Sequence, residues 1–174
     1  MDRIGIIELL ESQHQEVFQW LENQPDEKWI TGPEGKWTTG QHILHLVNSE
    51  KMLNKALSYP KFLVKRKFGV SNRESRSYSE VAKRYQERLS ENQEKARAFN
   101  SGLRTPSLKE KKHLMNTLKI QNKKLQYKTK KLKDKHIETL LLPHPLMGRM
   151  TLKEIIMWTA HHTEHHLTIL KNHY

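Results

Sequence analysis

The sequence contains no cysteine, which excludes disulfides, thiolate metal ligands and cysteine nucleophiles. Any metal site must therefore be built from histidine, aspartate or glutamate. The sequence also lacks a run of roughly 18 apolar residues that would span a membrane. Residues 1–4 lack the charged-then-apolar pattern that begins a signal peptide. We therefore expect a cytoplasmic protein that has no membrane partner.

Acidic residues are scarce relative to basic ones, with 19 aspartates and glutamates against 31 lysines and arginines and a net charge of +12. The basic excess is concentrated in residues 109–135, where eleven lysines accompany two acids. A basic segment of this kind can attract nucleic acid or anionic lipid. Because no nucleic-acid-binding motif accompanies it, we favour a solvated helix face. Nucleic-acid binding through residues 109–135 is the alternative.

The sequence is rich in helix-start signals of the form Ser/Thr-x-x-Glu/Gln, in which two side chains bond the free amides of a first turn. They pair Thr38 with Gln41, Ser77 with Glu80, Ser107 with Glu110, and Thr151 with Glu154. Apolar residues follow each signal at three- and four-residue spacing. With a further start near Asp2, the pattern predicts helices over residues 3–22, 39–58, 78–99, 108–136 and 152–171.

These helices predict a single domain over residues 1–174 with an all-α fold. The simplest arrangement is an up-and-down four-helix bundle with an additional basic helix. No alternating strand pattern longer than a few residues is present. Within the basic helix, Leu118, Leu125 and Leu132 recur every seven residues, which predicts packing against the bundle core, with dimerisation as the alternative.

The last predicted helix carries two pairs of histidines spaced four residues apart, so that the two rings of each pair lie one above the other. On a helical wheel, His162 and His166 fall about 80° and 40° from the centre of the apolar face. His161 and His165 fall about 180° and 140° away, which predicts that they face solvent. The inward pair can grip one divalent ion through its imidazole nitrogens.

The second predicted helix supplies candidates for a third ligand, His42 and His45. Both lie near the flank of the apolar face, so the wheel does not choose between them. Glu50, on the same helix, is a candidate base beside a metal, as is His42, although each is better explained as an ordinary bundle residue.

Two segments resemble a known family. The segment KWTTGQHILHLVNSE, residues 36–50, is similar to a family segment that places one histidine after a tryptophan. The segment HPLMGRMTLKE, residues 144–154, followed by His162 and His166, is similar to the family's "HP-x-x-G-x-l-T-x-x-E" and closing "H-x-x-x-H". The sequence thus resembles the DinB/YfiT-like superfamily, with the matching segments in the same order over nearly the whole chain.

The resemblance implies a four-helix bundle in which three histidines hold a divalent metal, and by position these are His45, His162 and His166. We expect zinc or nickel, with manganese or iron as alternatives. The resemblance also implies a homodimer and a small-molecule substrate. It implies one of two reactions, hydrolysis or transfer of a low-molecular-weight thiol such as bacillithiol or mycothiol.

No catalytic residue is assigned from the sequence. The metalloprotease pattern His-Glu-x-x-His is absent, and Glu164 falls about 120° from the apolar centre, away from the ion. Residues 61–76 are predicted to form a basic loop that Phe62 and Phe68 pin to the bundle, with a phosphate-contacting loop or a lid over a pocket as the alternatives. Three hypotheses remain: a metal-dependent thiol S-transferase or hydrolase, a bundle that its metal only stabilises, and a nucleic-acid-associated protein.

Overall fold

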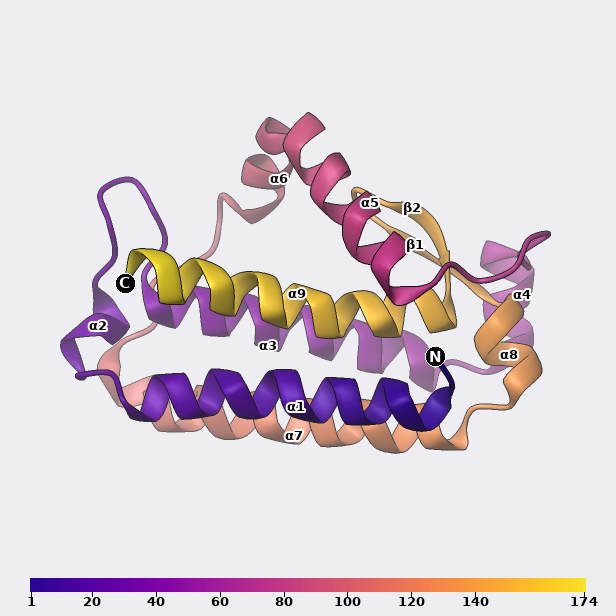
Figure 1. Ribbon diagram of the computed structural model, residues 1–174, viewed down its shortest axis with the longest axis horizontal. Helices are drawn as coiled ribbons and strands as arrows, with labels where there is room; N and C mark the ends of the chain where they lie inside the picture. The colour runs from indigo at the N-terminus through magenta and orange to yellow at the C-terminus, as the bar shows by residue number, and fades with distance from the viewer.

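The computed structural model describes residues 1–174, except for the side chains of residues 99 and 100. The described chain is mostly helical, which confirms the all-α prediction, and it adds one two-stranded antiparallel sheet (Figure 1). None of its helices has the length and apolar character that crossing a bilayer requires. The elements are α1 (Arg3–Glu22), α2 (Glu27–Ile30), α3 (Thr39–Ser58), α4 (Lys61–Phe68), α5 (Tyr78–Glu91), α6 (Gln93–Asn100), a 3-10 turn (Leu108–Glu110), α7 (Lys111–Lys131), α8 (Asp134–Thr139), β1 (Leu141–His144), β2 (Gly148–Thr151) and α9 (Leu152–His173).

The four long helices α1, α3, α7 and α9 lie side by side. Helix α1 packs against α7 and α9, and α3 packs against the same two helices. Figure 1 shows that α3 and α7 run in one direction and that α1 and α9 run in the other. The predicted up-and-down order is therefore wrong, because the segment containing α4, α5 and α6 carries the chain back across the molecule before α7 begins.

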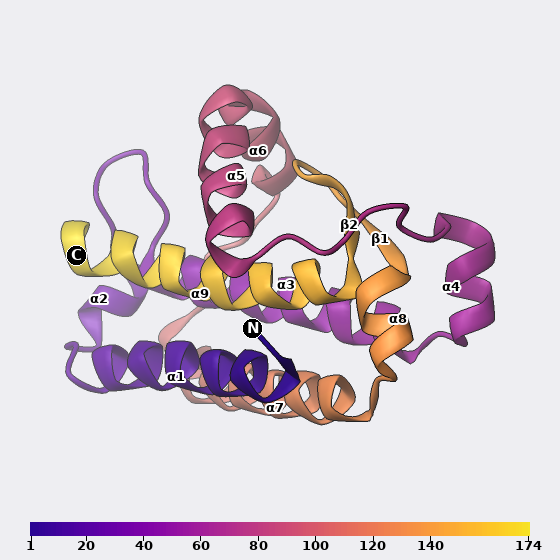
Figure 2. The same cartoon turned by 45° about the vertical axis from the view of Figure 1, so that its right-hand side comes forward.

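The basic helix α7 is one of the four long helices and not an addition to them. Its Leu114, Leu118 and Leu125 are buried against the neighbouring helices, and Leu132 is buried just beyond its end. The seven-residue leucine repeat is thus used for core packing, as predicted. The additional helix outside the four long ones is instead α5, which packs on α9. Figure 2 shows that α5 and α6 lie on the side of the molecule away from α1 and α7.

All four predicted helix-start signals form, each with both of its reciprocal hydrogen bonds. They begin α3, α5, the 3-10 turn before α7, and α9. The predicted third helix is divided at Asn92, whose side-chain amide donates to the carbonyl of Arg88 and whose backbone leaves the helical conformation. The predicted fourth helix ends at Lys131, and α8 follows as a separate element.

The predicted basic loop and the segment between the last two predicted helices both contain regular structure. Helix α4 occupies the first half of the predicted basic loop. Proline lacks a backbone N–H and so favours the end of one helix and the start of another, where that N–H would have no partner within the helix. Pro60 lies at such a point, between α3 and α4. Gly69, with a φ of 84°, ends α4. Before α9, strands β1 and β2 form a hairpin in which Leu141 lies opposite Thr151. Each strand has only four residues, too few for an alternating pattern to be recognised.

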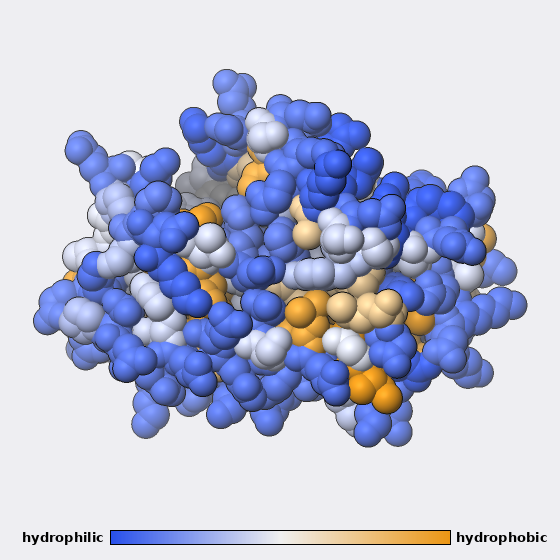
Figure 3. Space-filling model, viewed as in Figure 1, coloured by the Kyte–Doolittle hydropathy of each residue, from blue (hydrophilic) through white to orange (hydrophobic). Residues whose placement is uncertain are grey.

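The core consists of two clusters of buried apolar residues along the long helices. One includes Ile6 and Ile156 and extends to the β-hairpin. The other includes Val17, Ile43 and Leu167 and lies toward the opposite ends of the helices. The face shown in Figure 3 is mostly hydrophilic, with small separate groups of apolar residues along α1 and α9. Burial of the apolar faces therefore holds the long helices together.

Glu154 fixes the start of α9. Its side chain is fully buried and accepts hydrogen bonds from the amide of Thr151 at 3.1 Å and the amide of Arg76 at 2.8 Å. The guanidinium of Arg73 donates to both of its carboxylate oxygens. Burial alone would raise the pKa of Glu154, but these hydrogen bonds outweigh burial and lower it. The carboxylate thereby ties α9 to the segment that leads into α5.

Replacing this carboxylate should destabilise the fold. We expect Glu154→Gln to lower the free energy of unfolding by about 2 kcal/mol, because charge-assisted hydrogen bonds are lost in a buried place. Urea denaturation measures the change. Glu138→Gln is the matched control, since its carboxylate is 43% exposed and pairs with Lys153 near the surface. That pair should contribute less than about 0.5 kcal/mol. Equal losses in the two variants would contradict this account of Glu154.

Candidate metal centre

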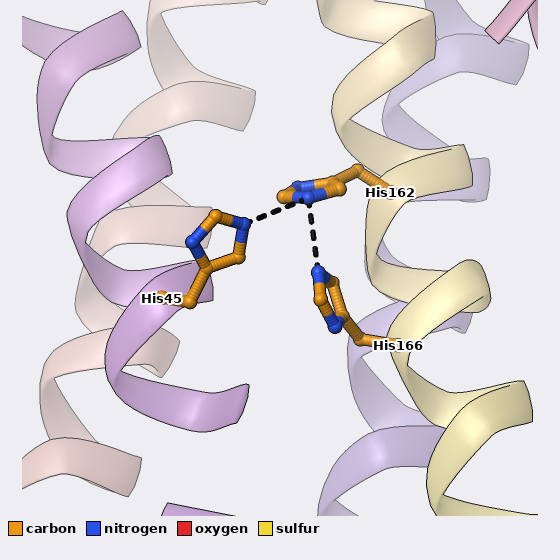
Figure 4. Close-up of side chains that lie close together, drawn as sticks. All are labelled: His45, His162 and His166. Atoms are coloured by element: carbon orange, nitrogen blue, oxygen red, sulfur yellow. Dashed lines mark hydrogen bonds between the residues drawn. The ribbon is translucent and has the colours of Figure 1, made fainter. Parts of the chain in front are cut away.

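Three histidine rings from two helices meet inside the molecule. His45 lies on α3, and His162 and His166 lie one turn apart on α9 (Figure 4). The Nε2 atom of His162 is 3.0 Å from the Nε2 atom of His45 and 3.0 Å from that of His166. Both α9 histidines are buried, as the helical wheel predicted, and His45 is half-buried. The structure thus brings together the three residues that the family resemblance implies.

The geometry of these nitrogens fits a divalent ion. Ring nitrogens bind zinc at about 2.0–2.1 Å, so two nitrogens on one ion lie roughly 3.0–3.4 Å apart at angles from a right angle to tetrahedral. One ring nitrogen from each histidine lies within 4.8 Å of the others. Without an ion the contacts cannot all be satisfied, because His162 Nε2 faces two other nitrogens and carries at most one proton. The cluster can therefore hold a metal.

Burial keeps these rings in the form that binds metal. It lowers the pKa of His162 and of His166 well below the ordinary value for histidine, and the neighbouring histidines lower both further. Both rings are therefore neutral near pH 7, with a lone pair on one nitrogen. A neutral imidazole is the ligating form, so no proton has to be displaced before metal binds.

Different contacts orient the three rings. The ring of His162 stacks on Trp158, with centroids 4.5 Å apart and planes at 19°. Its Nδ1 atom is buried and has no hydrogen-bond partner among the described residues. The ring of His45 lies 5.1 Å from Trp37, and that of His166 stacks parallel to the same tryptophan at 6.0 Å. Aromatic packing therefore accounts for much of the orientation at this site.

The sequence left His42 and His45 undecided, and the structure separates them. His45 faces the α9 pair, whereas His42 lies behind His166, with their Nδ1 atoms 2.8 Å apart. Burial, followed by the neighbouring His45 and His165, lowers the pKa of His42 to about 3. His42 is therefore a neutral neighbour of a candidate ligand.

The suggestion that Glu50 acts as a base beside the metal is not supported. Its side chain is 1% exposed and bonds to the Nε2 atom of His14 on α1. His14, which the sequence reading did not single out, is also buried, and its Nδ1 atom lies 2.7 Å from the carbonyl oxygen of Leu10. Glu50 is therefore engaged in a buried contact between α1 and α3 and does not line the pocket beside the histidines.

The prediction that His161 and His165 face solvent is wrong. Helix α5 packs on this side of α9, and the side-chain amide of Gln86 lies 3.0 Å from His161 and 3.4 Å from His165. Glu164 accepts a hydrogen bond from the hydroxyl of Tyr78 on α5. Its carboxylate thus points away from the three-histidine cluster, as the wheel predicted. The wheel failed here because α5 packs on the side of α9 that the wheel assigned to solvent, with buried apolar residues as well as polar ones in the contact.

A large pocket opens beside the three histidines. Its volume is about 1710 Å³, and all three rings contribute to its wall. Most of the remaining wall is apolar and aromatic, with Trp37, Tyr85 and Trp158 near the rings. Phe68 of α4 also lines the pocket, whereas Phe62 is 70% exposed. Of the two phenylalanines expected to hold this segment, only Phe68 is partly buried against the core.

His144 lines the same pocket. In the sequence it stood out only as the first residue of the family segment 144–154. It ends strand β1, and its Nδ1 atom accepts hydrogen bonds from the amides of Leu146 and Met147, both at 3.1 Å. Burial lowers its pKa to about 4. A neutral ring that accepts at Nδ1 carries its proton on Nε2. The pocket wall therefore includes, besides the three clustered histidines and His165, a histidine of defined tautomer.

A comparison with protein-family models matched residues 9–170 to the model of the DinB superfamily. The match covers both segments on which the sequence resemblance rests and all three clustered histidines. Comparisons with curated proteins and with solved structures gave no match.

The cluster predicts a sharp difference between neighbouring histidines. We expect purified protein to contain one divalent ion per chain, and His45→Ala, His162→Ala or His166→Ala to abolish it, because each removes one ligand. His161→Ala should retain the metal, since its ring faces α5. Elemental analysis of tag-free protein gives the metal content directly. Equal losses in His161→Ala and His162→Ala would show that the wrong face of α9 has been assigned.

Proposed function

The chain belongs to the DinB superfamily, and on that basis we propose that it is a metal-dependent enzyme whose ion is held by His45, His162 and His166. The observation that supports this best is the position of three clustered histidine nitrogens on the wall of a large pocket. Zinc or nickel suits three imidazole ligands, with manganese or iron as alternatives. Three protein ligands leave a coordination position for substrate, which is typical of catalytic sites.

The chemistry that a bound divalent ion supplies is Lewis-acid activation, which lowers the pKa of a water or thiol. The residues of this chain have separate tasks around it. Helices α3 and α9 hold the ligands on opposite sides, and the two α9 rings, kept neutral by burial, each have a lone pair for the ion. Trp37 and Trp158 pack beside the ligand rings and reduce the access of bulk water to them. His144 offers an N–H donor for a polar group of the substrate.

We propose thiol S-transfer or hydrolysis as the reaction, acting on a small and largely apolar molecule. The pocket supports an enzyme over a bundle that its metal only stabilises, because the latter needs no cavity beside the ion. Helix α7 does not favour nucleic-acid binding over a solvated helix. Its leucines are buried in the core, and on its outer side Lys111 and Lys128 bond to neighbouring elements.

Activity assays should separate the two reactions. We expect the zinc- or nickel-loaded protein either to join bacillithiol or mycothiol to the electrophile monochlorobimane, seen by fluorescence, or to hydrolyse p-nitrophenyl acetate. His162→Ala should fall to the rate without protein, and His161→Ala should keep its activity. Full metal loading without turnover of either substrate would favour the metal-stabilised bundle instead.

The charged residues of the pocket wall indicate the charge of the substrate. They are all basic, and within the described residues no aspartate or glutamate lines the pocket; the basic residues are Lys36, Arg66, Lys67, Lys95 and Arg97. Apolar walls with a basic rim suit a molecule that has an apolar body and an anionic group. We therefore propose an amphipathic anion as the preferred ligand.

Two ligands of equal chain length and opposite charge test this preference. Decanoate should displace the neutral dye Nile red from the pocket at a concentration at least about fivefold lower than decylamine, because the rim attracts anions at low salt. The double variant Arg66→Gln with Lys67→Gln should reduce the difference. The matched pair Lys123→Gln with Lys124→Gln, on α7, should leave it unchanged. Equal displacement by both ligands in the original protein would refute the charge preference.

A further inference from the structure

A line of polar contacts runs behind His166, on the side away from the other two candidate ligands. The Nδ1 atom of His166 lies 2.8 Å from the Nδ1 atom of His42 on α3. The Nε2 atom of His42 lies 3.4 Å from the hydroxyl of Tyr174, the residue that follows α9. That hydroxyl in turn bonds to the backbone carbonyl of Trp37. Every contact in the line runs between the α9 segment and the α3 segment, so the line also joins α9 to the start of α3.

The carbonyl at the end of this line fixes the direction of every hydrogen bond in it. A carbonyl only accepts, so the hydroxyl of Tyr174 must donate its single proton to Trp37. The same hydroxyl can then only accept from His42, whose Nε2 atom must carry the proton. A neutral imidazole has one ring proton, so His42 Nδ1 is an acceptor. It follows that His166 donates through Nδ1 and keeps its lone pair on Nε2, the atom that faces the cluster.

We propose that His42 and Tyr174 are positioning residues that hold His166 in the tautomer and ring orientation needed to bind metal. The inference rests on the proposed metal site, but not on any particular reaction. Partners of this kind also raise the basicity of a ligating ring, and their loss typically weakens metal binding about 10- to 100-fold. His162 has no such partner at Nδ1 among the described residues. The line therefore acts on one of the two α9 ligands.

The side chains allow variants that separate hydrogen bonding from packing. The ring of Tyr174 lies 5.7 Å from that of His42, edge to face, and Tyr174→Phe keeps this ring while removing only the hydroxyl. At position 42, His42→Asn places an amide oxygen where the Nδ1 acceptor was, whereas His42→Leu fills similar space with no acceptor. Tyr127→Phe is the matched control, because Tyr127 is 63% exposed on α7.

Zinc affinity, measured by competition with a chromophoric chelator, is the first test. We expect His42→Leu to weaken zinc binding about 10- to 100-fold and Tyr174→Phe to weaken it by a smaller factor of roughly 3 to 10. His42→Asn should recover most of the affinity, and Tyr127→Phe should match the original protein. Thermal unfolding of the metal-free variants is measured in parallel. Tyr174→Phe should stay folded, with a Tm close to that of Tyr127→Phe.

The outcomes distinguish this inference from the proposed site and function. If the original protein binds zinc and both Tyr174→Phe and His42→Leu bind it equally well, the inference is wrong and the site stands. If Tyr127→Phe weakens binding as much as Tyr174→Phe, the effect is not specific to this line and the inference is also wrong. If the original protein binds no metal, both proposals fail. Absence of catalysis in a protein that binds zinc through this line would count against the enzyme alone.

The tautomers give a readout that needs no metal. Long-range ¹H–¹⁵N spectra distinguish an imidazole protonated at Nδ1 from one protonated at Nε2. In the metal-free protein we expect His42 to be protonated at Nε2 and His166 at Nδ1. In Tyr174→Phe we expect each of these rings to populate both tautomers. A His42 ring protonated at Nδ1 would reverse the whole line and overturn the inference.

Discussion

Three imidazole nitrogens that face one another in a largely apolar interior set the condition that the rest of the structure has to meet. Charged rings at this spacing would repel one another strongly where the dielectric constant is low. Burial resolves this by keeping His162 and His166 neutral. The rings must also face each other across two separate helices. Each residue added to a helix rotates the next side chain by about 100°, so both helices need defined starts. The reciprocal caps at Thr38 and Thr151 provide those starts for α3 and α9.

Helix α9 is surrounded on more sides than an amphipathic surface helix. It contacts α1, α3 and α5 and also packs against the β-hairpin, so polar residues on several of its faces are covered. They are accommodated by specific partners: Glu154 bonds to Arg73, Glu164 to Tyr78, and His161 lies against Gln86. On the α5 side these hydrogen bonds accompany apolar contacts, because buried residues of α5 belong to the same core cluster as the first half of α9. This arrangement leaves the apolar face for α1 and α3, where the candidate ligands lie.

Local signals in the sequence were sufficient for the helix boundaries and for part of the site. Capping residues located the starts of α3, α5 and α9, and the apolar period identified His162 and His166 as the inward pair, while His45 came from the family resemblance. Contacts between distant segments could not be read in this way. The wheel assumed solvent opposite the apolar face and so misplaced His161. Nothing near Glu50 in the sequence indicates that it is buried in a contact with His14. The parallel course of α3 and α7 depends on the path of the long crossover between them.

The cluster has two chemically different sides. His45, His162 and His166 all line the pocket, together with Trp37 and Trp158, whereas His42 and Tyr174 do not. One side therefore offers space for a substrate, and the other offers hydrogen bonds that fix a ligand. The separation has a physical reason, because the groups that orient a ligand ring work best where water cannot compete for their hydrogen bonds. A ligand such as His166, which reaches both sides, can be held firmly from behind while its Nε2 atom stays available at the pocket wall. Its position on the last helix places it within reach of both.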